Sequence, residues 1–148
     1  MYEIQKYFTG KAYGGYSDCI TNVKNPWWDG STLSNCVGLA WGLFNMDRGR
    51  GRNFRRIRGD AKDIYPQAVP KGSGYLCGVP PKSSSIACYD NGGAGHVVYL
   101  LKVWRDGQAV GIESNYSGTL ANKLCLRVKI GNPRKWYKGY QGCIYDYC

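Results

Sequence analysis

Hydrophobic and polar residues follow a helical period in the first half of this chain and a strand-like period in the second. In the segment 31–46, STLSNCVGLAWGLFNM, apolar residues recur at i, i+3, i+4 and i+7, namely Val37, Ala40, Trp41 and Phe44. Ser34 or Asn35 is a suitable N-cap, so the pattern predicts a helix that begins at Cys36. Asp60 can cap a second, shorter helix that ends before Pro66.

From Ser84 onward, short runs rich in β-branched and aromatic residues replace the helical pattern. They predict strands over 85–89, 96–104, 109–114, 124–130 and 140–147. Residues 1–35 show no sustained period, and we expect them to form mainly loops. Helices followed by a run of strands predict an α+β fold.

The dipeptide Asp106-Gly107 predicts how the second and third strands pair. Asp-Gly is favoured in two-residue hairpin turns, so these strands should be antiparallel neighbours. In that register Asn115 is the diagonal neighbour of His96, and Glu113 lies one step further along the same sheet face. A bulge or a different turn would bring Glu113 closer. Both side chains can orient an imidazole, so the register decides between them.

The composition indicates one globular domain, residues 1–148. The 148 residues carry 20 Lys and Arg against 10 Asp and Glu, which gives a formal net charge of +10, and 43% are hydrophobic. A chain of this length buries enough surface for a core, which excludes disordered, collagen-like and coiled-coil classes. Its apolar runs are shorter than the ~20 residues that span a bilayer.

Cys36 and His96 are the residues best suited to carry chemistry. A Cys in the opening turn of a helix lies at the positive end of the helix dipole, which favours the nucleophilic thiolate. His96 is the single histidine, so any Cys-His pair must use it. The plain alternatives are a packed thiol and a strand-edge histidine without a role. With a polar residue to orient the imidazole, the pair would suit nucleophilic acyl transfer.

The other cysteines form no metal-binding motif. Seven Cys occur with no CxxC spacing and one His, so no zinc pattern is present. An odd number leaves at least one thiol without a partner inside the monomer, and we expect most of them to be small buried hydrophobic residues.

Five short blocks occur in a fixed order over nearly the whole chain. They are SNCVGLAWG at 34–42, GDAKDIY at 59–65, GHVV at 95–98, ESNY at 113–116 and YQGCIY at 140–145. In this order and at these separations they resemble the CHAP domain, the cysteine, histidine-dependent amidohydrolase/peptidase family. Five ordered blocks are far more specific than any one of them.

The resemblance implies a papain-like α+β fold and cleavage of amide bonds in bacterial peptidoglycan, as in the catalytic domains of many phage lysins. Cys36 matches the nucleophile and His96 the general base. Glu113 matches the acid that orients the imidazole, and Asn115 a further polar member. The bond would be that of an N-acetylmuramoyl-L-alanine amidase or of a stem or cross-bridge endopeptidase, cut through a thioester intermediate.

Residues before the nucleophile refine this expectation. Asn35 or Ser34 would supply a second oxyanion donor, and Trp27 and Trp28 would wall a groove for sugar or stem peptide unless they pack beneath the loops. Some relatives carry an Asp-rich calcium loop here, which the segment 25–30 does not reproduce. We therefore expect no metal and no cofactor.

Six arginines form the strongest charge feature: Arg48, Arg50, Arg52, Arg55, Arg56 and Arg58. A solvated loop between helices is the plain interpretation. The functional one is attraction to polyanions such as wall teichoic acid or nucleic acid.

Three functions stay open: a peptidoglycan hydrolase, a papain-like amidase or peptidase with a non-wall substrate, and a non-catalytic basic binding module. The N-terminus lacks the apolar region of a secretory signal, and we see no wall-binding module. We therefore expect the protein to reach the cell wall through a holin-like pore, on a virion, or as a piece of a longer protein.

Overall fold

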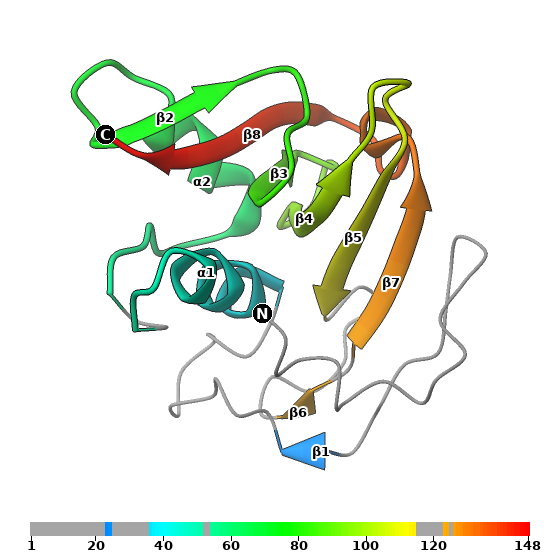
Figure 1. Cartoon of the computed structure of the whole chain (residues 1–148). Helices are drawn as coiled ribbons and strands as arrows, with labels where there is room; N and C mark the ends of the chain where they lie inside the picture. The colour runs from blue at the N-terminus through cyan, green and yellow to red at the C-terminus, as the bar shows by residue number, and fades with distance from the viewer. Residues whose placement is uncertain (1–22, 25–35, 52–53, 115–122, 125) are drawn as a thin grey trace.

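Two α-helices and a six-stranded sheet form the described fold of this computed structural model (Figure 1). The structure describes residues 23–24, 36–51, 54–114, 123–124 and 126–148. The helices are α1 (Cys36–Asp47) and α2 (Ala61–Ala68). The sheet contains β2 (Tyr75–Gly78), β3 (Ser85–Tyr89), β4 (His96–Val103), β5 (Ala109–Ser114), β7 (Leu126–Gly131) and β8 (Tyr140–Tyr147).

The strand order is β2-β8-β3-β4-β5-β7, and every neighbouring pair is antiparallel. Two short strands, β1 (Val23–Lys24) and β6 (Lys123–Leu124), pair separately, and a 3₁₀ helix, η3 (Pro133–Lys135), precedes β8. The α+β prediction is confirmed. None of the described helices is long and apolar enough to span a bilayer.

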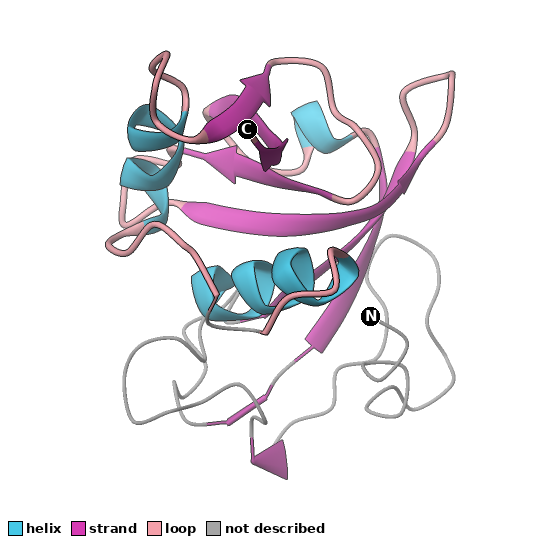
Figure 2. Cartoon of the chain, turned by 60° about the vertical axis from the view of Figure 1, so that its left-hand side comes forward, coloured by secondary structure: helices cyan, strands magenta, loops and turns pink. Residues whose placement is uncertain are grey.

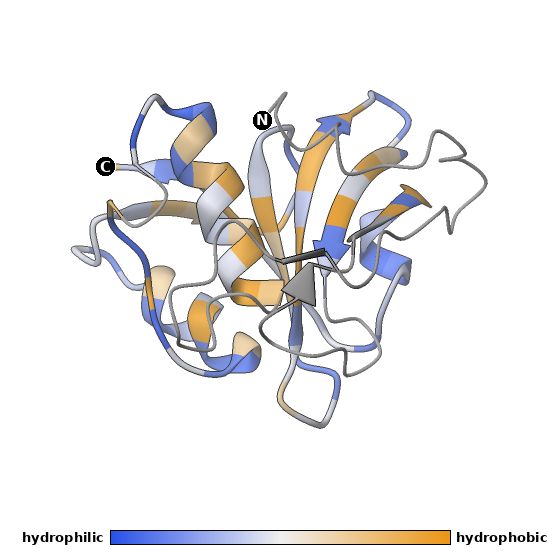
Figure 3. Ribbon diagram, turned by 90° about the horizontal axis from the view of Figure 1, so that it is seen from below, coloured by the Kyte–Doolittle hydropathy of each residue, from blue (hydrophilic) through white to orange (hydrophobic). Residues whose placement is uncertain are grey.

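Helix α1 lies along one side of the sheet (Figure 2). All residues from Cys36 to Asn45 are buried, as expected for a helix that is apolar all round. Its side chains share a core with Ile86, Val97 and Ile112 from three neighbouring strands. Hydrophobic residues gather on α1 and on the central strands, whereas several of the turns are hydrophilic (Figure 3). This burial fixes where α1 begins relative to the sheet.

A second, aromatic core forms from residues of β3, β4 and β8 that alternate along the strands with the residues packed against α1. Tyr89, Val98, Leu100 and Cys143 are fully buried there, and partly buried aromatic side chains pack against them, namely Trp136, Tyr137, Tyr140 and Tyr145. This aromatic core therefore lies beside the segment that joins η3 to β8.

The prediction that the second helix ends before Pro66 is wrong, because α2 continues to Ala68. A proline inside a helix has no N–H for the carbonyl four residues earlier, here that of Lys62. The side-chain amide of Gln141 donates to that carbonyl instead, at 3.2 Å. The helix is thus completed by a residue from β8.

Two strand predictions also need correction. Strand β2 was not predicted, because its four residues lie at the sheet edge and show no alternation of buried and exposed positions. The run 124–130 is divided, since Leu124 belongs to the separate β6 and the main strand begins at Leu126. The runs 85–89, 109–114 and 140–147 coincide with strands as predicted.

Candidate active site

Cys36 is the first residue of α1, as predicted, and it is 8% exposed. The first N–H groups of a helix have no partner within the helix, and the helix dipole favours negative charge beside them. No acidic residue in the first turn competes for this position. The local geometry therefore suits a sulfur that becomes an anion.

His96 is the first residue of β4 and is 5% exposed. The loop before it is shaped by Asn91, whose side-chain oxygen accepts from the N–H groups of Gly93 at 3.0 Å and Gly95 at 3.1 Å. Gly95 has a φ of +85°, and a Cβ there would lie 2.3 Å from the backbone nitrogen of Lys62. Glycine thus lets the loop press against α2 and fixes the start of β4.

The turn between β4 and β5 contains three residues, so the predicted two-residue turn is wrong. The Trp104 N–H donates to the Gln108 carbonyl at 2.8 Å, which closes the loop one residue earlier than predicted. Gly107 takes a φ of +86° as the third loop residue, and Asp106 accepts from the Gln108 N–H at 2.9 Å. A turn followed by a left-handed glycine is the usual form of a three-residue hairpin.

A bulge between Leu100 and Lys102 shifts the register a second time. Beyond the bulge, Glu113 comes one diagonal step from His96, the position that the predicted turn would give to Asn115. The register thus favours Glu113 as the partner of the imidazole.

The side chains of His96 and Glu113 meet. Nε2 of His96 lies 2.9 Å from Oε1 of Glu113, which is only 1% exposed. The Tyr137 hydroxyl donates to the same carboxylate oxygen at 2.5 Å, and its ring stands edge-on to the imidazole with centroids 4.7 Å apart. A buried carboxylate is costly unless donors surround it, and these two groups supply them.

The protonation of His96 is set by competing effects. Burial opposes the charged imidazolium, but hydrogen bonds to Cys36 and Glu113, together with their charges, outweigh it and raise the pKa of His96 to about 9. Because Nε2 faces Glu113, Nδ1 is the ring nitrogen available to Cys36. At neutral pH the site can therefore hold a proton on the imidazole beside the thiol.

The sequence profile of the CHAP domain family matches residues 25–115, more than half of the chain. The chain belongs to the CHAP family. The match includes the segments that carry Cys36, His96 and Glu113.

Two further comparisons agree with this membership. The chain is similar to the crystal structure of the wild-type endolysin LysIME-EF1, with a TM-score of 0.59 and 15% identity over 99% of this chain and 62% of that one. This likeness shows the fold, which is papain-like as predicted. A Streptococcus mutans serotype c protein named "Putative hydrolase" is 46% identical over 43 residues, which are 29% of this chain and 20% of that protein. The chain thus spans less than two thirds of either protein.

Several predicted residues of this CHAP domain lie outside the described residues: Trp27, Trp28, Ser34, Asn35, Arg52 and Asn115. Their proposed roles in the groove, the oxyanion site, polyanion binding and imidazole orientation stay predictions.

The sequence did not single out Tyr137. It lies between η3 and β8, in a segment without helical or strand period, and it is one of 13 tyrosines in the chain. The one usable signal was that Tyr137 lies three residues before the block at 140–145, which is one of the five blocks of the family resemblance.

The arginine-rich segment presents only part of its charge to solvent. Arg50, Arg55 and Arg58 are exposed, whereas Arg56 is partly buried. Arg48 forms an ion pair with Asp146 and donates to backbone carbonyls, so it presents little charge to solvent, and its role in binding polyanions stays a prediction.

Among the described residues, no three His, Cys, Asp or Glu side chains gather closely enough to hold a metal ion. The expectation of a metal-free CHAP domain stays a prediction, because the segment 25–30 lies outside the described residues. Five described cysteines are free thiols: Cys36, Cys77, Cys88, Cys143 and Cys148.

Proposed function

We propose that this CHAP domain hydrolyses amide bonds of bacterial peptidoglycan with Cys36 as nucleophile and His96 as general acid and base. The observation that carries the proposal is the buried pair of His96 and Glu113, joined at 2.9 Å, with Cys36 at the start of α1 close enough to the same imidazole to raise its pKa. Family membership supports the chemistry, and the endolysin fold supports a cell-wall substrate.

In the first step, the Cys36 sulfur attacks the amide carbonyl and the carbonyl oxygen becomes an oxyanion. The backbone N–H of Cys36 lies at the helix N-terminus and would donate to that oxyanion. His96 gives a proton to the departing amine, the C–N bond breaks, and a thioester remains on Cys36.

In the second step, neutral His96 removes a proton from water, and the resulting hydroxide attacks the thioester. The acyl group leaves as a carboxylic acid and the proton returns to the Cys36–His96 pair. Glu113 takes no part in the proton transfers; its carboxylate orients the imidazole and stabilises the positive charge of the imidazolium. The site is therefore regenerated without a cofactor.

Mass spectrometry of fragments released from several purified Gram-positive peptidoglycans tests the proposal. The unmodified protein should release muropeptides, and Cys36→Ala should release none. New termini would distinguish an N-acetylmuramoyl-L-alanine amidase from a stem or cross-bridge endopeptidase. A folded protein that cleaves no wall type would overturn the wall substrate, and a papain-like amidase with another substrate, or a binding module, would take its place.

We also propose that the exposed arginines Arg50, Arg55 and Arg58 attract wall teichoic acid. Their positive charges, together with the net charge of +10, suit a phosphate polymer. Lysis of walls that retain teichoic acid should fall as salt rises, and replacing the three arginines by glutamine should flatten this dependence. Equal salt dependence on walls stripped of teichoic acid would contradict the proposal.

A further inference from the structure

We infer that Tyr137 is a positioning residue of this site, which holds the Glu113 carboxylate against His96. The inference deepens the proposed function, because it assigns to the same reaction a residue from outside the matched family segment. Tyr137 acts through Glu113 rather than on the nucleophile or on the bond to be cut.

The first support is that two donors converge on one oxygen. Oε1 of Glu113 accepts from the Tyr137 hydroxyl at 2.5 Å and faces Nε2 of His96 at 2.9 Å. A carboxylate held by one donor can turn about its terminal bond, whereas a second donor from another direction restricts that rotation. The edge-on ring contact between Tyr137 and His96, at 4.7 Å, restricts the imidazole as well.

The second support is that the segment carrying Tyr137 is anchored on both sides. Before it, the Tyr89 hydroxyl donates to the Pro133 carbonyl at 2.6 Å, which fixes η3. After it, the Asp90 N–H donates to the Gly139 carbonyl at 2.9 Å. A Cβ on Gly139 would lie 1.8 Å from the Asp90 carbonyl oxygen, so the two segments are in close contact. The backbone that carries Tyr137 is therefore held in place on both sides of this residue.

The third support is a buried cation beneath the tyrosine. Lys129 of β7 is only 2% exposed, and its Nζ lies 4.6 Å from the centroid of the Tyr137 ring. Lys129 pairs with Gly111, so it lies on the same sheet face as Glu113. A positive charge behind the phenol strengthens its O–H as a donor and offsets the buried negative charge.

Among the described residues, the titratable groups that face or adjoin His96 are Cys36 of α1, Tyr89 of β3, Glu113 of β5 and Tyr137 after η3, while Lys129 of β7 lies behind Tyr137. Burial raises the pKa of Tyr89 far above the neutral range, so it stays uncharged. The Tyr137 hydroxyl is bonded to Glu113, the carboxylate that also faces the imidazole. Loss of this hydroxyl should therefore reach His96 through Glu113.

The single histidine makes this measurable without a substrate. NMR titration of the His96 ring in the full chain reports its pKa unambiguously. In Tyr137→Phe the carboxylate loses the donor that restricts its rotation toward His96, so the pKa of His96 should fall by about one unit. In the matched control Tyr140→Phe it should stay as in the wild type. The Tyr140 hydroxyl also makes a 2.5 Å hydrogen bond, to the Val79 carbonyl, and its ring also contacts Tyr89.

A double-mutant cycle completes the test. With the wall fragments as substrate, Tyr137→Phe should lower kcat about tenfold, shift the basic limb of the pH–rate profile downward, and leave KM unchanged. In a Glu113→Ala background the same change should have no further effect, because the acceptor is gone. An unshifted His96 in Tyr137→Phe, or equal losses in both backgrounds, would overturn the positioning role. If no substrate is cleaved at all, the proposed function fails, while the NMR titration still decides the inference.

Discussion

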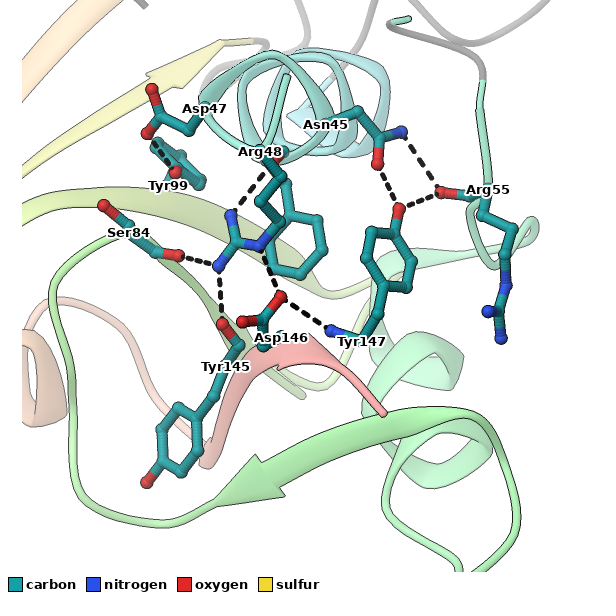
Figure 4. Close-up of polar contacts among 10 residues, drawn as sticks. Asn45, Asp47, Arg48, Arg55, Ser84, Tyr99, Tyr145, Asp146 and Tyr147 are labelled. Atoms are coloured by element: carbon teal, nitrogen blue, oxygen red, sulfur yellow. Dashed lines mark hydrogen bonds and ion pairs between the residues drawn. The ribbon is translucent and has the colours of Figure 1, made fainter. Parts of the chain in front are cut away.

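Polar groups gather at both ends of α1, but the groups differ in kind and in burial. At the N-terminal end, Cys36 lies beside the buried pair of His96 and Glu113, all three of which can gain or lose a proton. At the C-terminal end, the Arg48 guanidinium donates to the carbonyl of Phe44 at 2.9 Å and forms an ion pair with Asp146 at 2.9 Å (Figure 4). The same guanidinium also donates to the carbonyls of Ser84 and Tyr145, at 2.6 and 2.5 Å.

The N-terminal end of α1 thus lies beside the proposed reacting groups, whereas the C-terminal end carries contacts that stabilise the fold. The helix dipole favours an anion at the N-terminus, where the Cys36 sulfur lies, and a cation at the C-terminus, where the Arg48 guanidinium lies. A guanidinium does not titrate in the physiological range, so Arg48 can join α1 to β8 at any working pH. An imidazole can change its charge near neutrality, so His96 can take part in a reaction. Disruption of one end should therefore impair catalysis, and disruption of the other should impair stability.

The largest expected effect is the loss of hydrolysis in Cys36→Ala. Without the sulfur no thioester can form, and wall hydrolysis should fall by about 10⁴-fold or more. The free energy of unfolding should change by no more than about 1 kcal/mol, since a small side chain is lost. Zymography and urea denaturation measure the two quantities. The control Cys77→Ala, at a half-buried thiol of β2, should keep full activity; equal losses in both variants would remove Cys36 from the mechanism.

At the opposite end of α1, Arg48→Met should lower the free energy of unfolding by about 2 kcal/mol. The change leaves the backbone carbonyls of Ser84 and Tyr145 without their donor, whereas the exposed Asp146 can turn to water and contributes little. Urea denaturation measures the loss, and the pH–rate profile of the folded fraction should be unchanged. The control is Arg50→Met, because the Arg50 guanidinium is exposed and lies 4.4 Å from the Phe54 ring, and it should cost less than about 1 kcal/mol. Similar costs for both arginines would contradict a supporting role specific to Arg48.

The protonation of His96 predicts a pH range over which the folded state loses stability and the enzyme loses activity. The folded pKa of His96, about 9, is above its ordinary value of about 6.5, so protonated His96 stabilises the folded state. This contribution is complete below about pH 6.5 and is lost as the pH rises through about 9, with a total on the order of 3 kcal/mol. Hydrolysis should decline over the upper part of the same window, as the imidazolium that protonates the departing amine disappears.

Urea denaturation of the wild type and of His96→Gln at several pH values isolates this effect. Buried thiols also make the folded state less stable in alkaline solution, because burial raises the pKa of Cys88 and of Cys143. The difference between the two curves removes that contribution. Parallel curves between pH 6.5 and 9 would show that His96 is not held as an imidazolium.

Local signals in the sequence predicted the elements that bear the reacting groups. The start of α1 at Cys36 followed from apolar spacing and a capping segment, and the run 109–114 followed from its composition. The partner of His96 could not be chosen in this way, because it depends on a left-handed Gly107 and on a bulge between Leu100 and Lys102. Each shifts the register by one residue, and together they exchange Asn115 for Glu113 at the diagonal position.

Long-range contacts explain what else was missed. Arg48 resembled its neighbours in the arginine-rich segment, yet it alone among the described arginines forms an ion pair with Asp146, a residue 98 positions away. Tyr137 reaches Glu113 because the segment around Gly139 is docked on Asp90. Neither contact has a local pattern from which it could be predicted.

The smallest expected effect concerns α2, on which the loop before His96 rests. Pro66 leaves the Lys62 carbonyl without a helical donor, and the Gln141 amide supplies one at 3.2 Å. Gln141→Met should therefore lower the free energy of unfolding by about 1 kcal/mol, measured by urea denaturation. Pro66→Ala restores an N–H in the helix, so Gln141→Met should cost less in that background.

This cycle also sharpens the contrast between the two ends of α1. The Lys62 N–H donates to the Ala94 carbonyl at 3.1 Å, so a loosened α2 disturbs the loop that fixes His96. Compared at a temperature where both variants are folded, Gln141→Met should therefore lose more activity than Arg48→Met, although it loses less stability. If Arg48→Met loses more activity while folded, the two ends are mechanically coupled through α1, and the separation of chemistry from support fails. If the cycle is additive instead, the Gln141 amide does not replace the N–H that Pro66 lacks.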